Sequence, residues 1–217
     1  MKKKRIKMLS LAVGLLVVFV AWTLLVKAVD VRPIGPEGSK IGFSAFNSLV
    51  HRTVGVNMSL YVITDWLGLV PIATVLGFAA LGLCQLIKRK SLLKVDRSII
   101  ILGGFYVAVA AVFLLFEALA VNYRPVLIEG CLEASYPSST TMLAMCVLPT
   151  AMMQFCRLIG NATLRKTVNI LCGLFTAFMV IGRLMCGVHW FTDILGGVLF
   201  SVAAIMLYCS ANNFLEQ

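Results

Sequence analysis

Charged side chains are scarce in this sequence. Asp, Glu, Lys and Arg make up 13% of the 217 residues, and only 9 of them are acidic. A soluble domain carries about 25% charged residues. Hydrophobic residues account for 60% of the chain, and the mean hydropathy is +0.97. This composition excludes a soluble globule and a disordered chain, and it favours a protein built from membrane helices.

The sequence also lacks the cysteine spacing of a disulfide framework or a zinc site. Its 7 cysteines are an odd number, contain no CxxC pair and fall mostly inside apolar runs, which is typical of small buried residues. Cys131 and Cys186 both fall on the predicted outer side. A single bridge between them is an alternative to two free thiols that spacing does not decide.

Six apolar runs are long enough to cross a bilayer, which takes about 20 residues. We place them at about 8–29, 60–87, 98–121, 138–155, 167–186 and 191–210. They leave no room for a separate soluble domain. We therefore expect an all-α fold, a polytopic membrane helix bundle with six transmembrane helices that forms one membrane-embedded domain over residues 1–217.

Two segments near the N-terminus have alternative interpretations. The basic start MKKKRIK precedes an apolar run that is longer than the 7–15 residues of a signal peptide and has no clear cleavage site, so a retained helix is favoured. The segment 41–50 spaces its apolar residues loosely at helical intervals. It is predicted as a short interfacial helix, with an ordered loop as the alternative.

The basic residues predict the orientation. With a cytoplasmic N-terminus, six spans place the N-terminal tail and the loops at 88–97 and 157–166 inside. These segments hold 13 of the 19 Lys and Arg residues. This asymmetry follows the positive-inside rule. The charge is therefore a topology signal, and we expect no nucleic-acid partner because no readout module accompanies it.

The remaining charges near the outer ends of the spans are functional candidates. They are Glu117, Arg124, Glu129, Glu133, Arg183 and Asp193, and His189 lies among them. Glu129 and Glu133 are interpreted as ordinary loop charges at the interface.

The spacing within this group predicts a phosphate site. His189 and Asp193 are four residues apart and share one helix face, so Asp193 can accept a hydrogen bond from one imidazole nitrogen and leave the other free to attack. Arg124 and Arg183 can hold phosphate oxygens in planar forks. Ser138 and Ser139 begin the fourth span, where free backbone N–H groups bind anions. We expect these groups to meet at the outer membrane face.

These residues resemble the type 2 phosphatidic acid phosphatase family of integral-membrane lipid phosphate phosphatases. The family motifs KxxxxxxRP, PSGH and SRxxxxxHxxxD correspond in order and spacing to EALAVNYRP at 117–125, PSST at 137–140 and GRLMCGVHWFTD at 182–193. The resemblance implies that His189 forms a phosphohistidine and that Asp193 orients it. It also implies that Arg124, Arg183 and Ser138 hold phosphate, with no metal and no other cofactor.

Four positions depart from the family pattern. Glu117 replaces the lysine of the first motif, Gly182 replaces the serine of the third, and PSST carries Ser139 and Thr140 in place of glycine and histidine. That histidine protonates the leaving group in the family. Burial can make Glu117 a substitute acid, or Glu117 can pair with Arg124. The roles of Glu117, Thr140 and Tyr123 stay open at this stage.

A missing general acid favours a leaving group that departs as a stable anion. General-acid catalysis contributes typically about 10²–10⁴-fold. An isoprenoid diphosphate such as undecaprenyl diphosphate needs less of it than phosphatidic acid does. We therefore expect a lipid phosphate or diphosphate phosphatase in a bacterial cytoplasmic membrane, with both termini cytoplasmic and the site facing outward.

Two other classes of protein remain as alternatives. Glu117 and Thr140 are compatible with a non-catalytic relative that binds lipid phosphates or protein partners, although such a binder has no need of a positioned nucleophile. A transporter is disfavoured because no repeated pair of broken helices is present. The oligomeric state does not follow from the sequence.

Overall fold

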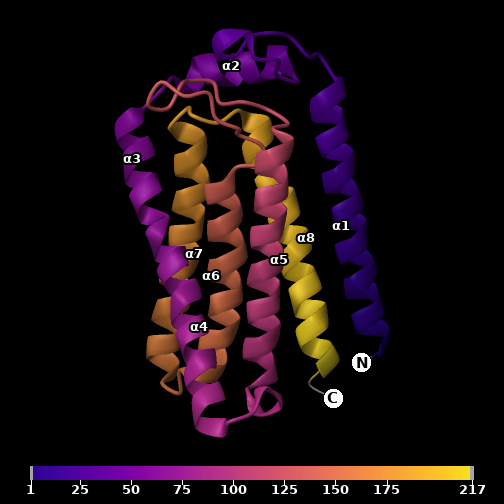
Figure 1. The fold of residues 1–217 in the computed structure, drawn as a ribbon, viewed down its shortest axis with the longest axis vertical. Helices are drawn as coiled ribbons and strands as arrows, with labels where there is room; N and C mark the ends of the chain where they lie inside the picture. The colour runs from indigo at the N-terminus through magenta and orange to yellow at the C-terminus, as the bar shows by residue number, and fades with distance from the viewer. Residues whose placement is uncertain (1, 216–217) are drawn as a thin grey trace.

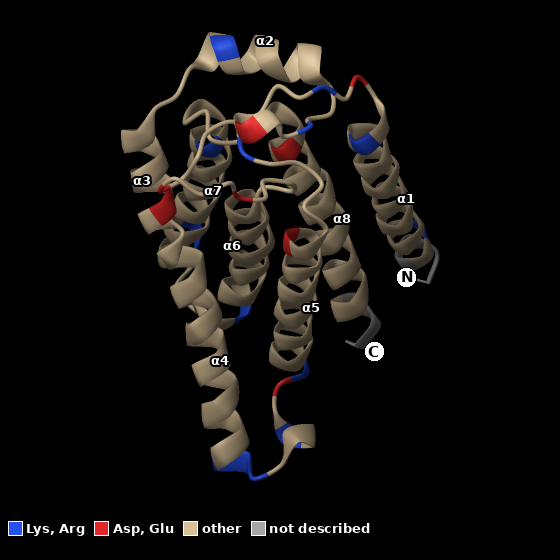
Figure 2. Ribbon diagram, turned by 45° about the horizontal axis from the view of Figure 1, so that its top comes forward, with Lys and Arg blue, Asp and Glu red and all other residues tan. Residues whose placement is uncertain are grey.

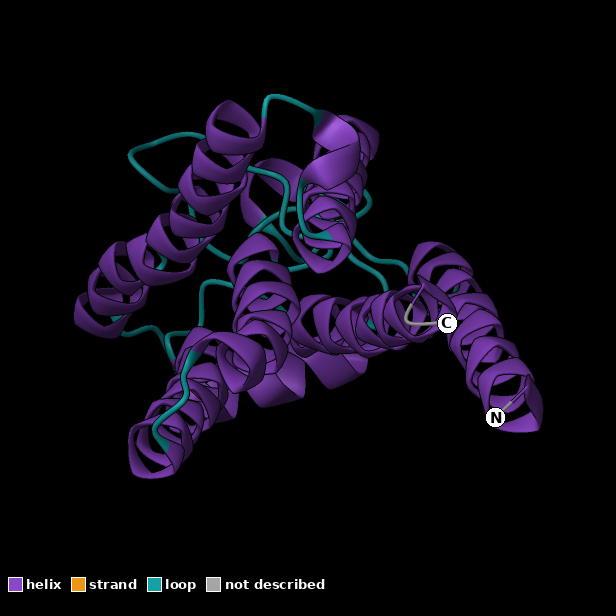
Figure 3. Cartoon of the chain, turned by 90° about the horizontal axis from the view of Figure 1, so that it is seen from below, coloured by secondary structure: helices purple, strands orange, loops and turns teal. Residues whose placement is uncertain are grey.

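The computed structural model describes residues 2–215 as helices joined by loops, without a β-strand in that range (Figures 1 and 3). The helices are α1 (Lys2–Ala28), α2 (Ser44–Val54), α3 (Met58–Leu67), α4 (Leu69–Arg89), α5 (Arg97–Leu119), α6 (Ser139–Leu158), α7 (Ala162–Met185) and α8 (Phe191–Leu215). The two 3-10 turns are η1 (Pro36–Gly38) and η2 (Leu92–Lys94). Within the described residues, 6 segments are long and apolar enough to cross a membrane, which confirms the all-α membrane fold.

The second membrane crossing is not the single helix that the sequence predicts. It consists of α3 and α4, which meet at Gly68. The Gly68 amide donates to the carbonyls of Thr64 (3.1 Å) and Asp65 (2.9 Å). Pro71 lies in the first turn of α4 and has no N–H to donate back to α3, so the backbone ladder cannot run through unbroken. The last turn of α3 places Thr64 and Asp65 next to Arg183.

The seventh helix begins earlier than the sequence predicts, at Ala162 rather than Thr167. Asn161 caps it by accepting a hydrogen bond from the Leu164 amide (3.0 Å). The basic residues Arg165 and Lys166 therefore belong to its first turns. The charge of these two residues predicted a loop. A helix end that reaches the interface can carry them, because it keeps its cations outside the apolar layer.

The predicted interfacial helix is confirmed as α2, which lies across one end of the bundle (Figure 1). Asn47 faces inward and is completely buried. Its side chain donates to Thr192 Oγ1 of α8 (3.0 Å) and accepts from the Thr192 amide (3.3 Å). The helix is thus bound to the start of α8, next to the functional site.

Three clusters of described residues form the buried core, and the smallest contains Ile128, Cys186 and Val188. The two larger clusters lie between the helices. One joins α1, α5, α6 and α8 and contains Phe19, Phe116, Met142 and Phe200, with Tyr136 from a loop. The other lies between α4, α5, α6 and α8 and includes Phe78, Ile99 and Tyr208. Most large side chains on α1, α4 and α7 point outward and are exposed, as expected for surfaces that face lipid.

Acidic residues lie mostly at the end of the bundle that carries α2, whereas basic residues occur at both ends (Figure 2). Both termini and the basic loops 88–97 and 157–166 lie at one end, and α2 and the long loop 120–138 lie at the other (Figures 1 and 2). This places the chain ends and basic loops together, as predicted. All 7 cysteines lie within the described residues and are free, so the alternative of a Cys131–Cys186 bridge is wrong for this structure.

Candidate functional site

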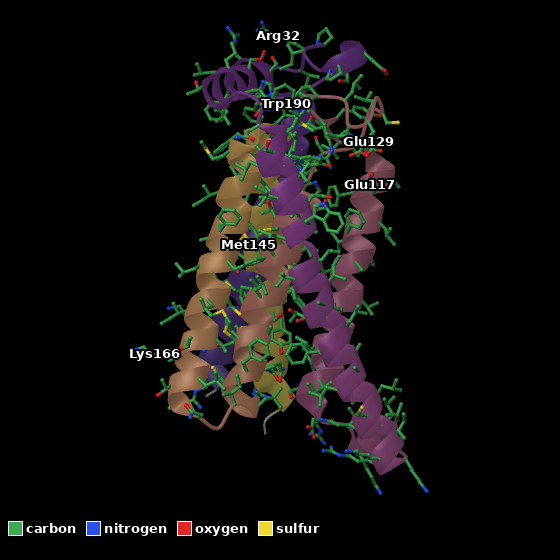
Figure 4. All side chains as sticks on the ribbon, turned by 90° about the vertical axis from the view of Figure 1, so that its left-hand side faces the viewer. Arg32, Glu117, Glu129, Met145, Lys166 and Trp190 are labelled. Atoms are coloured by element: carbon green, nitrogen blue, oxygen red, sulfur yellow. The ribbon has the colours of Figure 1, made fainter. Side chains whose placement is uncertain are left out.

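The candidate residues gather beneath α2, where the loop 186–190 joins α7 to α8 and meets the loop 120–138. Figure 4 places Trp190, Glu117 and Glu129 at this end of the molecule and Lys166 at the opposite end. Asp193 lies in the first turn of α8 and Arg183 in the last turn of α7, but His189 lies in the loop just before α8, so His189 and Asp193 do not share a helix face as the spacing predicted. The two arginines, His189 and Asp193 are therefore brought together, as the spacing predicts.

His189 is the centre of this group, and it is 3% exposed. Its Nε2 lies 3.4 Å from Arg124 Nη1 and 3.4 Å from Arg183 Nη2. Guanidinium groups can only donate hydrogen bonds, so Nε2 must present its lone pair to them. The ring proton then resides on Nδ1, on the side of Asp193. The Nε2 lone pair of His189 thus points at the place where the two arginines converge.

Asp193 is fully buried and held from two sides. Its Oδ2 accepts from the Trp190 amide (3.0 Å), and its Oδ1 accepts from Asn122 Nδ2 (3.0 Å). The distance from Asp193 Oδ2 to His189 Nδ1 is 3.9 Å, and Nδ1 has no hydrogen-bond partner within the described residues. The predicted hydrogen bond is not made in this structure, although the carboxylate lies where an imidazolium would be stabilised.

The surroundings of His189 lower its pKa well below the usual 6.5. Burial disfavours the charged ring most, and the positive charges of Arg124 and Arg183 add to this effect. A neutral imidazole at neutral pH is the form that can attack phosphorus.

Glu133 is not the ordinary loop charge that the sequence indicated. Its Oε2 lies 2.8 Å from Arg124 Nε, and its carboxyl group lines the same cavity as His189. No sequence pattern indicates this pairing, because it depends on how the loop 120–138 folds back. The Arg124 amide donates to the Glu133 carbonyl (3.0 Å), which fixes the two residues side by side.

Arg183 is held by α3, which sequence reasoning did not connect with the site. Its Nη1 lies 3.3 Å from Thr64 Oγ1 and 3.7 Å from Asp65 Oδ1. The Tyr61 ring lies against both arginines, with its centroid 4.9 Å from Arg183 Cζ and 5.8 Å from Arg124 Cζ. Cation–π contacts of this kind hold guanidinium planes in place.

Backbone contacts fix the loop that carries His189. The Gly187 carbonyl lies 3.1 Å from His51 Nε2 of α2, and the Cys186 carbonyl accepts from the Asn57 amide (3.0 Å). Trp190 Nε1 donates to the Tyr123 carbonyl (2.7 Å). The sequence left the role of Tyr123 open. In the structure, its backbone carbonyl anchors the loop that carries His189.

A cavity of about 210 Å³ opens in front of His189. Polar lining comes from Arg124, Glu117, Glu133, Ser135, Ser139 and His189. Ser138 is completely buried, and its amide donates to the Asp193 carbonyl (3.0 Å). Ser139 and not Ser138 therefore faces the cavity, and the Ser138 hydroxyl has no partner within residues 2–215.

Thr140 lines a different space, an apolar groove of about 530 Å³ between α4, α5 and α6. The groove shares Phe113, Ser139 and Met142 with the polar cavity, so the two spaces adjoin. Asp65 lies at the rim of the groove. The position that holds histidine in the family motif therefore faces the apolar groove, one residue after Ser139, which lines both spaces.

Residues 118–215 match the model of the PAP2 superfamily. The resemblance drawn from the three motifs is confirmed, and the matched segment contains Arg124, Ser138, Arg183, His189 and Asp193. Glu117, the reversed charge of the first motif, falls one residue before the PAP2 segment.

One solved structure is similar to this chain over nearly its whole length. It is the crystal structure of the first transmembrane PAP2 type phosphatidylglycerolphosphate phosphatase from Bacillus subtilis. It aligns with a TM-score of 0.59 and 17% identity over 94% of this chain and 96% of that chain. At this identity the likeness shows the fold alone. No curated protein sequence matches the chain.

Proposed function

We propose that this protein is a membrane lipid phosphatase that works through a phosphohistidine on His189. The observation that carries the proposal is the lone pair of His189 Nε2, which lies 3.4 Å from the end nitrogens of both Arg124 and Arg183. Two buried guanidinium groups stabilise the charge that develops on phosphate oxygens during transfer. A nucleophile at their meeting point supports phosphoryl transfer over simple binding.

The chemistry follows from this arrangement in two steps. His189 Nε2 attacks phosphorus, the N–P bond forms, and the bond from phosphorus to the leaving oxygen breaks with its electron pair on that oxygen. Asp193 stabilises the imidazolium through Nδ1–H. Water then attacks the phosphohistidine, the N–P electron pair returns to the ring, and both hydrogens of the water end on the released dihydrogen phosphate.

The paired spaces support a lipid as the substrate. A polar cavity suits a phosphate, and the adjoining apolar groove suits a hydrocarbon chain. The groove lies between helices that face the bilayer, so a lipid can enter sideways without leaving the membrane. The PAP2 match of residues 118–215 supports the same class of reaction.

The lack of a general acid favours an isoprenoid diphosphate, such as undecaprenyl diphosphate, as the substrate. Thr140 cannot supply a proton as the family histidine does, and a phosphorylated leaving group needs little such help. With the site at the outer face of a bacterial cytoplasmic membrane, this reaction would recycle a lipid carrier after its head group has been used outside.

The test is phosphate release by the purified protein from lipid mono- and diphosphates, measured in magnesium and separately in chelator. We expect turnover in the wild type, trapping of phosphate on a histidine, and loss of both in His189→Ala. The variant should keep the wild-type melting temperature. Lipid binding without turnover on any substrate would replace the enzyme with the non-catalytic alternative.

Thr140→His tests the argument from the leaving group. The added imidazole should raise turnover of monoesters such as phosphatidic acid by about 10-fold or more, because it supplies the missing acid. Turnover of a prenyl diphosphate should change much less. Equal gains on both substrates, or wild-type turnover of phosphatidic acid as fast as of a prenyl diphosphate, would contradict the diphosphate preference.

A further inference from the structure

The charge of the polar cavity does not match a bare phosphate. Arg124 faces the carboxylate of Glu133 at 2.8 Å, and Arg183 faces that of Asp65 at 3.7 Å. Each phosphate-binding cation thus already has an anionic neighbour. Glu117 adds a further carboxyl group to the cavity wall, at the position where the family motif has a lysine.

Unlike Glu133 and Asp65, Glu117 has no ion-pair partner among the described residues. It lies near the outward end of α5 and shares the cavity with His189 (Figure 4). An anion bound at Arg124 and Arg183 would therefore face the negative charge of Glu117, which opposes binding.

A buried polar atom indicates that this cavity receives a polar ligand. The Ser135 side chain is 3% exposed and lines the cavity, yet its hydroxyl has no hydrogen-bond partner among residues 2–215. A buried hydroxyl without a partner is costly, so a polar ligand in the cavity would satisfy a group that the chain leaves unpaired.

We propose that Glu117, with Glu133 beside it, forms a cation subsite next to the phosphate position. The inference rests on the proposed function and narrows its substrate to a lipid phosphate that brings a positive charge next to its phosphorus. The positive charge cancels the repulsion from Glu117, and the arginines remain available to the phosphate oxygens.

Two sources of that cation are chemically equivalent for the subsite. One is an ammonium group attached covalently to the lipid near its phosphate. The other is a magnesium ion chelated by a diphosphate, which arrives as part of the substrate. Magnesium is commonly held by one or two carboxylates together with substrate phosphates, and the described residues include no group of three or more ligands for a resident metal.

Matched substrates separate these two sources. Sphingosine 1-phosphate and its N-acetyl derivative differ in one positive charge and are compared in chelator. Farnesyl diphosphate is compared in magnesium and in chelator. We expect the wild type to favour the ammonium lipid, or the magnesium complex, by about 10-fold in kcat/KM, the effect of one charged hydrogen bond.

Variants assign the preference to Glu117. Glu117→Gln should bring the favoured ratio close to one, and Glu117→Lys should raise turnover of farnesyl diphosphate in chelator. Glu129→Gln is the matched control, because it removes the same charge from the same side of the protein at a residue outside the cavity. It should keep the wild-type ratio.

A wild type that shows neither preference, or a Glu117→Gln variant that keeps the full ratio, would overturn the subsite. Binding of the same lipids, measured by native mass spectrometry, separates this result from failure of the proposed function. Binding ratios that follow Glu117 without any phosphate release would keep the subsite and reject the phosphatase. Phosphate release with no cation preference would keep the phosphatase and reject the subsite.

Discussion

His189 combines burial, two neighbouring arginines and a lone pair directed at them. These features keep the ring neutral and the nucleophile available at physiological pH. Its pKa lies well below 6.5 because charging the ring would bury a third positive charge beside two others.

This environment predicts how His189 titrates. As the pH falls through 6.5, His189 should stay neutral and protonate only at clearly lower pH, because its folded pKa is lowered. The chain has only 2 histidines, His51 and His189, so nuclear magnetic resonance of the labelled rings can follow each one. Arg124→Gln should move the His189 midpoint upward. A His189 midpoint at or above 6.5 in the wild type would contradict this account.

We propose that Asn122 acts on the proposed reaction through Asp193. Its Nδ2 lies 3.0 Å from Asp193 Oδ1 and 3.4 Å from Thr192 Oγ1, inside the buried layer. Asn122→Ala removes a hydrogen bond to a charged group, worth about 10- to 100-fold. We expect this loss in kcat with little change in KM, because the phosphate contacts of the arginines persist. A rise in KM alone would assign Asn122 to substrate binding instead.

At the scale of elements, the short loop between α7 and α8 decides where the nucleophile lies. Gly187 has a positive φ of 68°, and its Cα lies so close to Gly55 that a Cβ would meet the Gly55 carbonyl oxygen at 1.9 Å. The loop therefore packs tightly against the end of α2. His189 follows two residues later, so an error in the loop moves the site.

Gly187→Ala should lower both stability and activity. The strained φ alone costs about 1–3 kcal/mol, and the overlap with Gly55 adds to it. Thermal unfolding in detergent and phosphate release measure the two effects. Gly173→Ala in α7 is the control, since its added Cβ meets no atom within 4 Å. Equal melting temperatures for the two variants would show that the α2 contact does not hold the loop.

At the scale of the whole molecule, the bundle has one basic end and one end that carries the site. We propose that the basic end is cytoplasmic, as the distribution of Lys and Arg predicts. Two exposed native cysteines mark the ends: Cys131 lies in the loop that covers the site, and Cys156 lies near the end of α6 at the basic loop.

Labelling of these cysteines tests the orientation. A membrane-impermeant maleimide should label Cys131 in intact right-side-out vesicles and Cys156 only after permeabilisation. Cys131→Ser and Cys156→Ser assign each signal. Labelling of Cys156 from the outside would invert the topology and place the site in the cytoplasm.

The sequence by itself determined the class of fold and the core of the site. Apolar runs long enough for the bilayer specify membrane helices regardless of context, because lipid leaves the backbone no other partner. The four-residue spacing of His189 and Asp193 places the two close together, although His189 lies in the loop just before α8 and not on its face. Local rules of this kind need no knowledge of distant segments.

Only the tertiary structure decided what surrounds that core. Glu133 reaches Arg124, and Thr64 and Asp65 reach Arg183, through contacts between segments far apart in sequence. The break at Gly68 and the separation of Thr140 from the polar cavity arise from how the helices pack. Electrostatics depends on distances in space, and spacing along the chain does not supply these. The balance of charge at the phosphate position therefore became visible only in the folded molecule.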